Sequence, residues 1–161
     1  MTSSIAWRAG MIVLVVLAVA IMIITAPNAP FALQDWNMET RLGLPLHMKI
    51  WLGFMLVANL SSVLFVRRHI AARFVLGAWV ASHVWIGAIE GSGLFSPTGG
   101  FVSFGHLVFW APAIWALYAY RSEIKLPSAY GVWACYISFV YAVSLVFDSR
   151  DSVIWIASLV R

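Results

Sequence analysis

The chain has 161 residues, of which 63% are hydrophobic and only 10% are charged, and its mean hydropathy is +0.92. Because ordinary soluble domains carry about 25% charged residues, this composition excludes a soluble protein and indicates an integral membrane protein. The formal net charge is +4, but the 10 basic residues lie between apolar runs, where membrane topology explains them better than nucleic-acid binding does.

Five apolar runs, taken in chain order, predict five transmembrane helices. Each run is long enough to cross ~30 Å of hydrocarbon as a helix, and none shows the two-residue alternation of a strand. The predicted spans are residues 7–26, 47–66, 74–90, 101–120 and 130–147. The final stretch, SVIWIASLVR, is too short to cross and is expected to form an interfacial tail. The predicted fold is an all-α bundle forming one transmembrane domain over residues 1–161.

The basic residues predict the orientation of these spans. Arg67, Arg68 and Arg73 fall in the turn RRHIAAR between the second and third spans. Short loops rich in arginine and lysine stay on the cytoplasmic side of a membrane. The N-terminus is therefore predicted to be cytoplasmic and the C-terminus periplasmic, in a bacterial inner membrane.

Ionisable residues gather near the outer ends of the predicted spans. His83 and Glu90 lie on one face of the third span, and His83 is ~10 Å below its outer end. His106 is ~8 Å below the outer end of the fourth span, and His47 stands at the outer start of the second. An ionisable residue in hydrocarbon costs ~2.5–3.5 kcal/mol, so we expect these groups to face protein, water or a ligand.

The two deeper histidines, His83 and His106, are predicted to bind a cofactor. Imidazoles at one depth on neighbouring antiparallel helices match the axial ligation of a haem b. With His47 or Glu90 added, the same group could bind a transition-metal ion, namely copper, iron or zinc. A histidine–carboxylate pair could also relay protons or hydrogen-bond a quinol without a bound cofactor.

Structural roles compete with these functional ones. Histidines in membrane helices often only join helices through hydrogen bonds. Glu90 could be a boundary carboxylate beside Arg41 or Lys49 at the helix end. His69 belongs to the basic turn, where it is expected to be solvated.

Tyr141, Ser144 and Asp148 recur at helical spacing in and after the fifth span. Serine and tyrosine hydroxyls commonly join membrane helices. Asp148 is followed at once by further charged residues, so it is expected to belong to a solvated terminus.

The functional interpretation therefore has three versions, and it leaves open whether the protein is an enzyme. No phosphate-binding loop, HExxH, GxSxG or CxxC motif occurs, and Cys135 is alone. The leading hypothesis is electron transfer or a membrane oxidoreductase with a haem b or metal site, with quinone as a possible substrate. The second is a structural or assembly subunit, packed in the bilayer through Gly87 and Gly91 against other membrane subunits or its own copies. The third is a small transporter or channel lined by histidine and glutamate.

Overall fold

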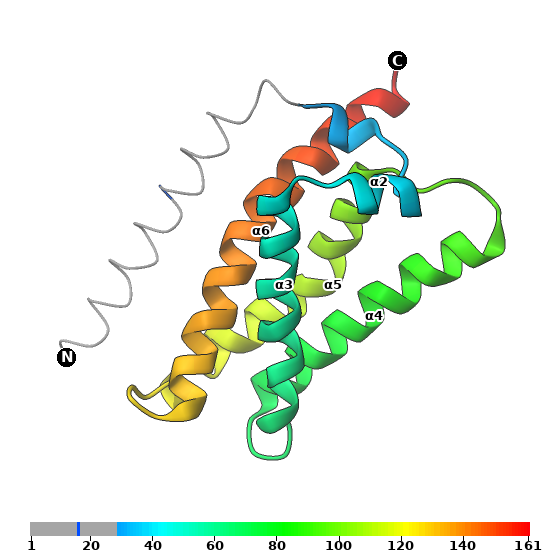
Figure 1. The fold of residues 1–161 in the computed structure, drawn as a ribbon. Helices are drawn as coiled ribbons and strands as arrows, with labels where there is room; N and C mark the ends of the chain where they lie inside the picture. Colours follow the sequence, from blue (N-terminus) through cyan, green and yellow to red (C-terminus); the bar gives the residue numbers. More distant parts are fainter. Residues whose placement is uncertain (1–15, 17–28) are drawn as a thin grey trace.

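The structure is a computed structural model that describes Val16 and residues 29–161. Four of its helical stretches in residues 29–161 are long and apolar enough to cross a membrane (Figure 1). In chain order the elements are η1 (Ala29–Leu33), α2 (Met38–Gly43), α3 (Leu46–Leu60), η2 (Ser61–Leu64), α4 (Ile70–Ser92), α5 (Gly99–Ala119), η3 (Arg121–Glu123) and α6 (Ala129–Leu159).

The prediction of apolar helices long enough to cross a membrane is confirmed for these four stretches. They are Leu46–Leu64, Ile70–Ser92, Gly99–Ala119 and Ala129–Leu159, and they correspond to the second to fifth predicted spans. The first predicted span, residues 7–26, lies outside the described residues apart from Val16. The count of five spans and the orientation of the termini therefore stay predictions.

The last helix differs from its prediction. α6 has 31 residues and continues to Leu159 instead of ending at Phe147, so SVIWIASLVR is not a separate tail. Its length of ~46 Å exceeds the ~30 Å hydrocarbon thickness. The prediction ended the helix at Phe147, where hydropathy falls. In the structure the polar residues that follow Phe147 remain in the helix and hydrogen-bond within it. The Ser152 hydroxyl donates to the Asp148 carbonyl at 2.6 Å, and Ser152 is 2% exposed.

The helix that starts as α3 changes from α-helical to 3₁₀ winding before it ends. α3 gives way to the 3₁₀ helix η2 at Ser61, whose hydroxyl donates to the Ala58 carbonyl at 3.0 Å. The Ser62 hydroxyl bonds in the same way to Asn59. Such backward bonds from serine weaken regular α-helical pairing. The Ala58 carbonyl also accepts a bond from the Trp133 indole at 3.0 Å, which ties α3 to α6.

The connections between the helices gather at the two ends of the bundle. At one end, the turn before α4 and the connection from α5 to α6 lie together (Figure 1). We call it the basic end, because its basic residues are Arg67, Arg68, Arg73, Arg121 and Lys125. At the opposite end, η1, α2, the α4–α5 loop and the end of α6 lie together (Figure 1). There Trp36 N–H donates to the Pro97 carbonyl at 2.7 Å, which holds the segment before α2 on the α4–α5 loop.

Packing of α5 against α4 and α6 forms the core. Gly105 on α5 leaves room for a side chain of α4, because a Cβ on Gly105 would lie 2.7 Å from Cε3 of Trp85. The Trp85 ring therefore lies over the α5 backbone and stacks on Phe101, with ring centroids 4.6 Å apart. Small residues let membrane helices approach in this way. Residues buried in the core include Val75, Trp110, Ala113, Ala116, Ala134, Ile137, Val140 and Tyr141.

Candidate functional site

A histidine and an aspartate from neighbouring helices form the most buried ion pair between elements of the described residues. Nδ1 of His106 on α5 lies 3.2 Å from Oδ2 of Asp148 on α6. Their side chains are only 22% and 14% exposed. His106 lies ~10 Å along α5 from Gly99, within the apolar length of the helix. The pair therefore places an ionisable couple between two helices that are both apolar enough to cross a membrane.

An aromatic stack continues from this pair into the core. The His106 ring lies on Trp110, with centroids 4.3 Å apart and planes within 17°. Trp110 stacks in turn on Tyr141, with centroids 4.6 Å apart and planes within 11°. Trp110 is 2% exposed, and its indole N–H donates to the Ser82 hydroxyl on α4 at 3.4 Å. The stack fixes the plane of the imidazole, while Asp148 fixes its rotation within that plane.

Hydrogen bonds from α6 reach α3 on the far side of this stack. The Tyr141 hydroxyl donates to Oδ1 of Asn59 at 2.7 Å, and the Asn59 amide donates to the Met55 carbonyl at 2.8 Å. The Ser144 hydroxyl lies 3.0 Å from the Met55 sulfur. Both polar groups of the buried Asn59 side chain therefore have partners, as a group removed from water requires.

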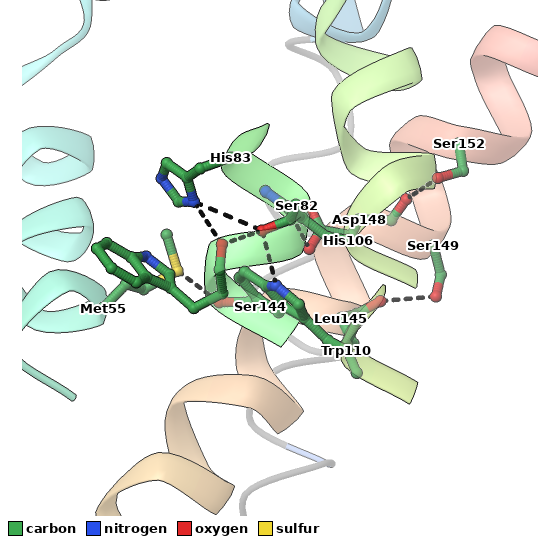
Figure 2. A network of polar contacts seen from close by, with 11 residues as sticks. Met55, Ser82, His83, His106, Trp110, Ser144, Leu145, Asp148, Ser149 and Ser152 are labelled. Carbon is green, nitrogen blue, oxygen red and sulfur yellow. Dashed lines mark hydrogen bonds and ion pairs between the residues drawn. The ribbon is translucent and has the colours of Figure 1, made fainter. Parts of the chain in front are cut away.

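His83 has a different environment from His106. Its Nδ1 donates to the carbonyl of Trp79, one turn back on α4, at 2.8 Å, and its ring lies against the Trp79 ring. His83 is exposed, and Figure 2 shows its ring apart from the His106–Asp148 pair. The two histidines are linked only indirectly, because Ser82 lies 3.5 Å from Nδ1 of His83 and accepts from Trp110.

The remaining predicted ligands lie apart from this pair. Glu90 accepts from the guanidinium of Arg41 at 2.7 Å, an ion pair between α2 and the end of α4. This is the boundary arrangement that competes with a ligand role for Glu90. His47 is exposed near the start of α3. Within residues 29–161, no group of three or more His, Cys, Asp or Glu side chains gathers in an arrangement that could hold a metal ion.

His69 is packed and not simply solvated as expected. Its Nδ1 lies 2.8 Å from Oε2 of Glu123, and its ring stacks on Tyr130 with centroids 3.5 Å apart. The contact joins the turn before α4 to η3 and the start of α6. His69 therefore acts as a clamp at the basic end, far along the bundle from His106.

Sequence reasoning missed Asp148 and Trp110 as members of the site. The helical spacing of Tyr141, Ser144 and Asp148 is a usable signal, since it places all three on one side of α6. Trp110 follows His106 by one helical turn, which is the spacing at which side chains on a helix meet. The first signal is masked by Arg150 and Asp151, because charged residues after Asp148 are typical of a solvated helix end.

The geometry gives His106 a defined chemical capability. An ionised Asp148 can only accept hydrogen bonds, so Nδ1 of His106 is then the donor and Nε2 carries the free lone pair. A carboxylate that holds Nδ1 in this way fixes the tautomer and the orientation of the ring. The His106 Nε2 atom can therefore accept a proton, accept a hydrogen bond from a hydroxyl or bind a metal.

Comparison with known protein families, with curated proteins and with solved structures finds no match for this chain.

Proposed function

We propose that this integral membrane protein takes part in electron transfer within the bilayer, as an electron-transfer protein or a membrane oxidoreductase. In this proposal His106, held by Asp148, exchanges a proton with a membrane-soluble quinone. Quinones take up protons together with electrons when they are reduced, and release both when they are oxidised. The single observation that carries the proposal is the largely buried His106–Asp148 pair between α5 and α6.

The energetic cost of this pair favours a functional role. Ionisable residues are expensive in membrane helices and commonly mark proton or substrate pathways. Apolar side chains of similar volume often replace a buried ion pair without loss of stability. A pair that served packing alone would therefore have an inexpensive apolar substitute. Imidazole is also suited to proton exchange, because it changes charge near neutral pH in its ordinary environment.

A bound cofactor is the other version of the same proposal. A haem b or a transition-metal ion ligated by Nε2 of His106 would use Asp148 as the carboxylate that orients a ligating histidine. His83 bonds to its own helix, Glu90 is paired with Arg41 and His47 is exposed, which together favour His106 as the principal imidazole. The predicted bis-histidine arrangement with His83 would need that ring to leave the Trp79 carbonyl.

The test is to extract the protein from its membrane in mild detergent and to measure its bound quinone, its absorption spectrum and its metal content. The variants are His106→Gln and Asp148→Asn, with His83→Gln as the matched control on α4. We expect bound quinone in the native protein, loss of it in His106→Gln, a reduced amount in Asp148→Asn and no change in His83→Gln. A Soret band or stoichiometric metal that follows the same order would favour the cofactor version. A native protein without quinone, haem or metal, or equal contents in all variants, would refute the proposal.

One observation favours a second candidate, a structural or assembly subunit. Gly87 and Gly91 face one side of α4, and a Cβ added at either position would meet no described atom within 4 Å. A glycine pair at this spacing allows the backbone of a second helix to approach closely. Gly87→Leu and Gly91→Leu should then release a copurifying partner or dissociate a homo-oligomer. Recovery of the native protein only as a monomer would count against this candidate.

A further inference from the structure

A shallow groove runs between α4 and α5 on the outside of the bundle, starting at the basic end. Its volume is about 380 Å³. The lining residues are Arg73, Phe74, Gly77, Ala78 and Ala81 on α4 and Val108, Phe109 and Pro112 on α5. From Arg73 to Ala81 the groove extends ~12 Å along α4. Its body is therefore apolar, and its single charged residue stands at the end that meets the membrane boundary.

The guanidinium of Arg73 is fixed at the mouth of this groove. Its Nε donates to the Val66 carbonyl at 2.7 Å, and its Nη2 donates to the Arg67 carbonyl at 3.2 Å. A guanidinium carries five N–H donors, so three remain free for another acceptor. Because arginine presents these donors in a planar fork, it suits phosphate well. The turn that Arg73 contacts also carries Arg67 and Arg68, which are both exposed and add positive charge beside the mouth.

Glycine keeps the body of the groove open. A Cβ added at Gly77 would meet no described atom within 4 Å, so α4 leaves unfilled space beside Phe74. On the opposite wall, Pro112 lies inside α5 and presents its ring next to Val108 and Phe109. Apart from Arg73, none of the residues that line the groove has a side chain that forms hydrogen bonds. The order of chemistry along the groove is cationic first and apolar afterwards.

We propose that this groove binds one anionic phospholipid, with the headgroup phosphate on Arg73 and an acyl chain along Gly77 and Ala81. Charge complementarity favours this ligand, because a phospholipid, like the groove, is charged at one end and apolar along the rest of its length. Clusters of basic residues next to membrane helices attract anionic headgroups in the same way. An apolar second helix would fit the body of the groove but would offer no acceptor to the exposed guanidinium of Arg73, whereas a phosphate would. The inference requires only that α4 and α5 lie in a bilayer, and it does not depend on the proposed redox function.

The experiment reconstitutes the full chain in vesicles of phosphatidylcholine with phosphatidylglycerol, and in vesicles of phosphatidylcholine alone. Lipid retained by the protein is then counted by native mass spectrometry after detergent extraction. The test variants are Arg73→Gln, which removes the phosphate contact, and Gly77→Leu, which fills the groove. The matched controls are Arg121→Gln, which removes the same charge at the basic end outside the groove, and Gly53→Leu, which adds the same side chain on α3. Gly53 is a fair control because a Cβ there also meets nothing within 4 Å.

We expect the native protein to retain phosphatidylglycerol over phosphatidylcholine, and Arg73→Gln to lower that retention about five-fold. Gly77→Leu should lower retention of the lipid while every arginine is still present, and both controls should behave as the native protein. An equal loss in Arg73→Gln and Arg121→Gln would indicate general charge attraction and overturn the site. Equal retention of the two lipids would overturn it as well. Displacement of the lipid by soluble glycerol phosphate would show a headgroup site without an acyl-chain groove, which also contradicts the proposal.

Discussion

The imidazole of His106 and the carboxylate of Asp148 join α5 to α6 across 3.2 Å (Figure 2). The His106 ring also stacks on Trp110, which stacks in turn on Tyr141. This relationship places an ionisable pair between two helices that are both apolar enough to cross a membrane. It also allows a direct test of whether the pair serves stability or function.

Removing one member of the pair should destabilise the protein more than removing both. His106→Leu leaves a carboxylate without its partner, and Asp148→Leu leaves an imidazole without its acceptor. Each single variant should lose about 1–3 kcal/mol, because an unpaired buried polar group pays its full desolvation cost. The double variant should recover much of that loss, since apolar residues commonly replace a buried pair at little cost. Unfolding of the three variants in mixed micelles measures this difference.

The same cycle separates the two roles of the pair. If the double variant folds as well as the native chain but binds no quinone, haem or metal, the pair is required for function and not for folding. Additive losses in the double variant would contradict the coupling between His106 and Asp148. Full ligand content in the double variant would exclude the pair from the site.

The buried hydrogen bond from Tyr141 to Asn59 should contribute to the association of α3 with α6. Tyr141→Phe keeps the stack on Trp110 but leaves Oδ1 of Asn59 without its donor. We expect a loss of about 0.6–1.7 kcal/mol, the range measured for polar bonds between membrane helices. Tyr136→Phe is the matched control, because the Tyr136 hydroxyl donates to the Phe54 carbonyl from a less buried position. A larger loss in the control than in Tyr141→Phe would show that burial does not set the strength of these bonds.

How much of this arrangement was predictable depends on the kind of signal. Apolar length alone located α3, α4, α5 and the first part of α6, because crossing hydrocarbon requires about twenty apolar residues. Depth alone placed His83 and His106 at one level, but depth carries no information about rotation around the helix axis. His83 turns to its own helix and His106 turns to α6. Packing decides which helices face each other, and the periodicity of apolar residues in a single sequence does not show it.

The end of α6 shows the same limit from another side. The residues after Phe147 are polar, and hydropathy therefore predicted a break. In the structure Asp151 and Ser152 are 7% and 2% exposed. The Asp151 carbonyl packs against Gly100 at the start of α5, where a Cβ would lie 2.7 Å from the carbonyl oxygen, yet in the sequence Gly100 is indistinguishable from an ordinary loop glycine.

Gly100 should be intolerant of any side chain. A Cβ there would lie 2.7 Å from the Asp151 carbonyl oxygen and 2.9 Å from the Ala32 carbonyl oxygen, and both are backbone atoms that cannot easily move. Gly100→Ala should cost about 1–3 kcal/mol, the usual range for forced overpacking. Gly87→Ala is the control inside α4, where the added Cβ meets nothing within 4 Å. The control should be neutral or up to about 1 kcal/mol more stable, because alanine favours a helix over glycine. Equal thermal stability of both variants would contradict the close packing at the start of α5.

His69 should stabilise the basic end through two separable contacts. His69→Phe keeps an aromatic ring on Tyr130 and removes the bond to Glu123, whereas His69→Ala removes both contacts. A stacked aromatic pair contributes about 0.5–1.5 kcal/mol beyond the area it buries. The Glu123 side chain is 37% exposed, so solvent screens its ion pair and we expect little loss from that contact alone. His69→Phe should therefore remain close to the native protein in thermal unfolding, and His69→Ala should unfold at a lower temperature. If His69→Phe unfolds at a temperature as low as that of His69→Ala, the hydrogen bond to Glu123 and not the ring stack holds the turn before α4 to the start of α6.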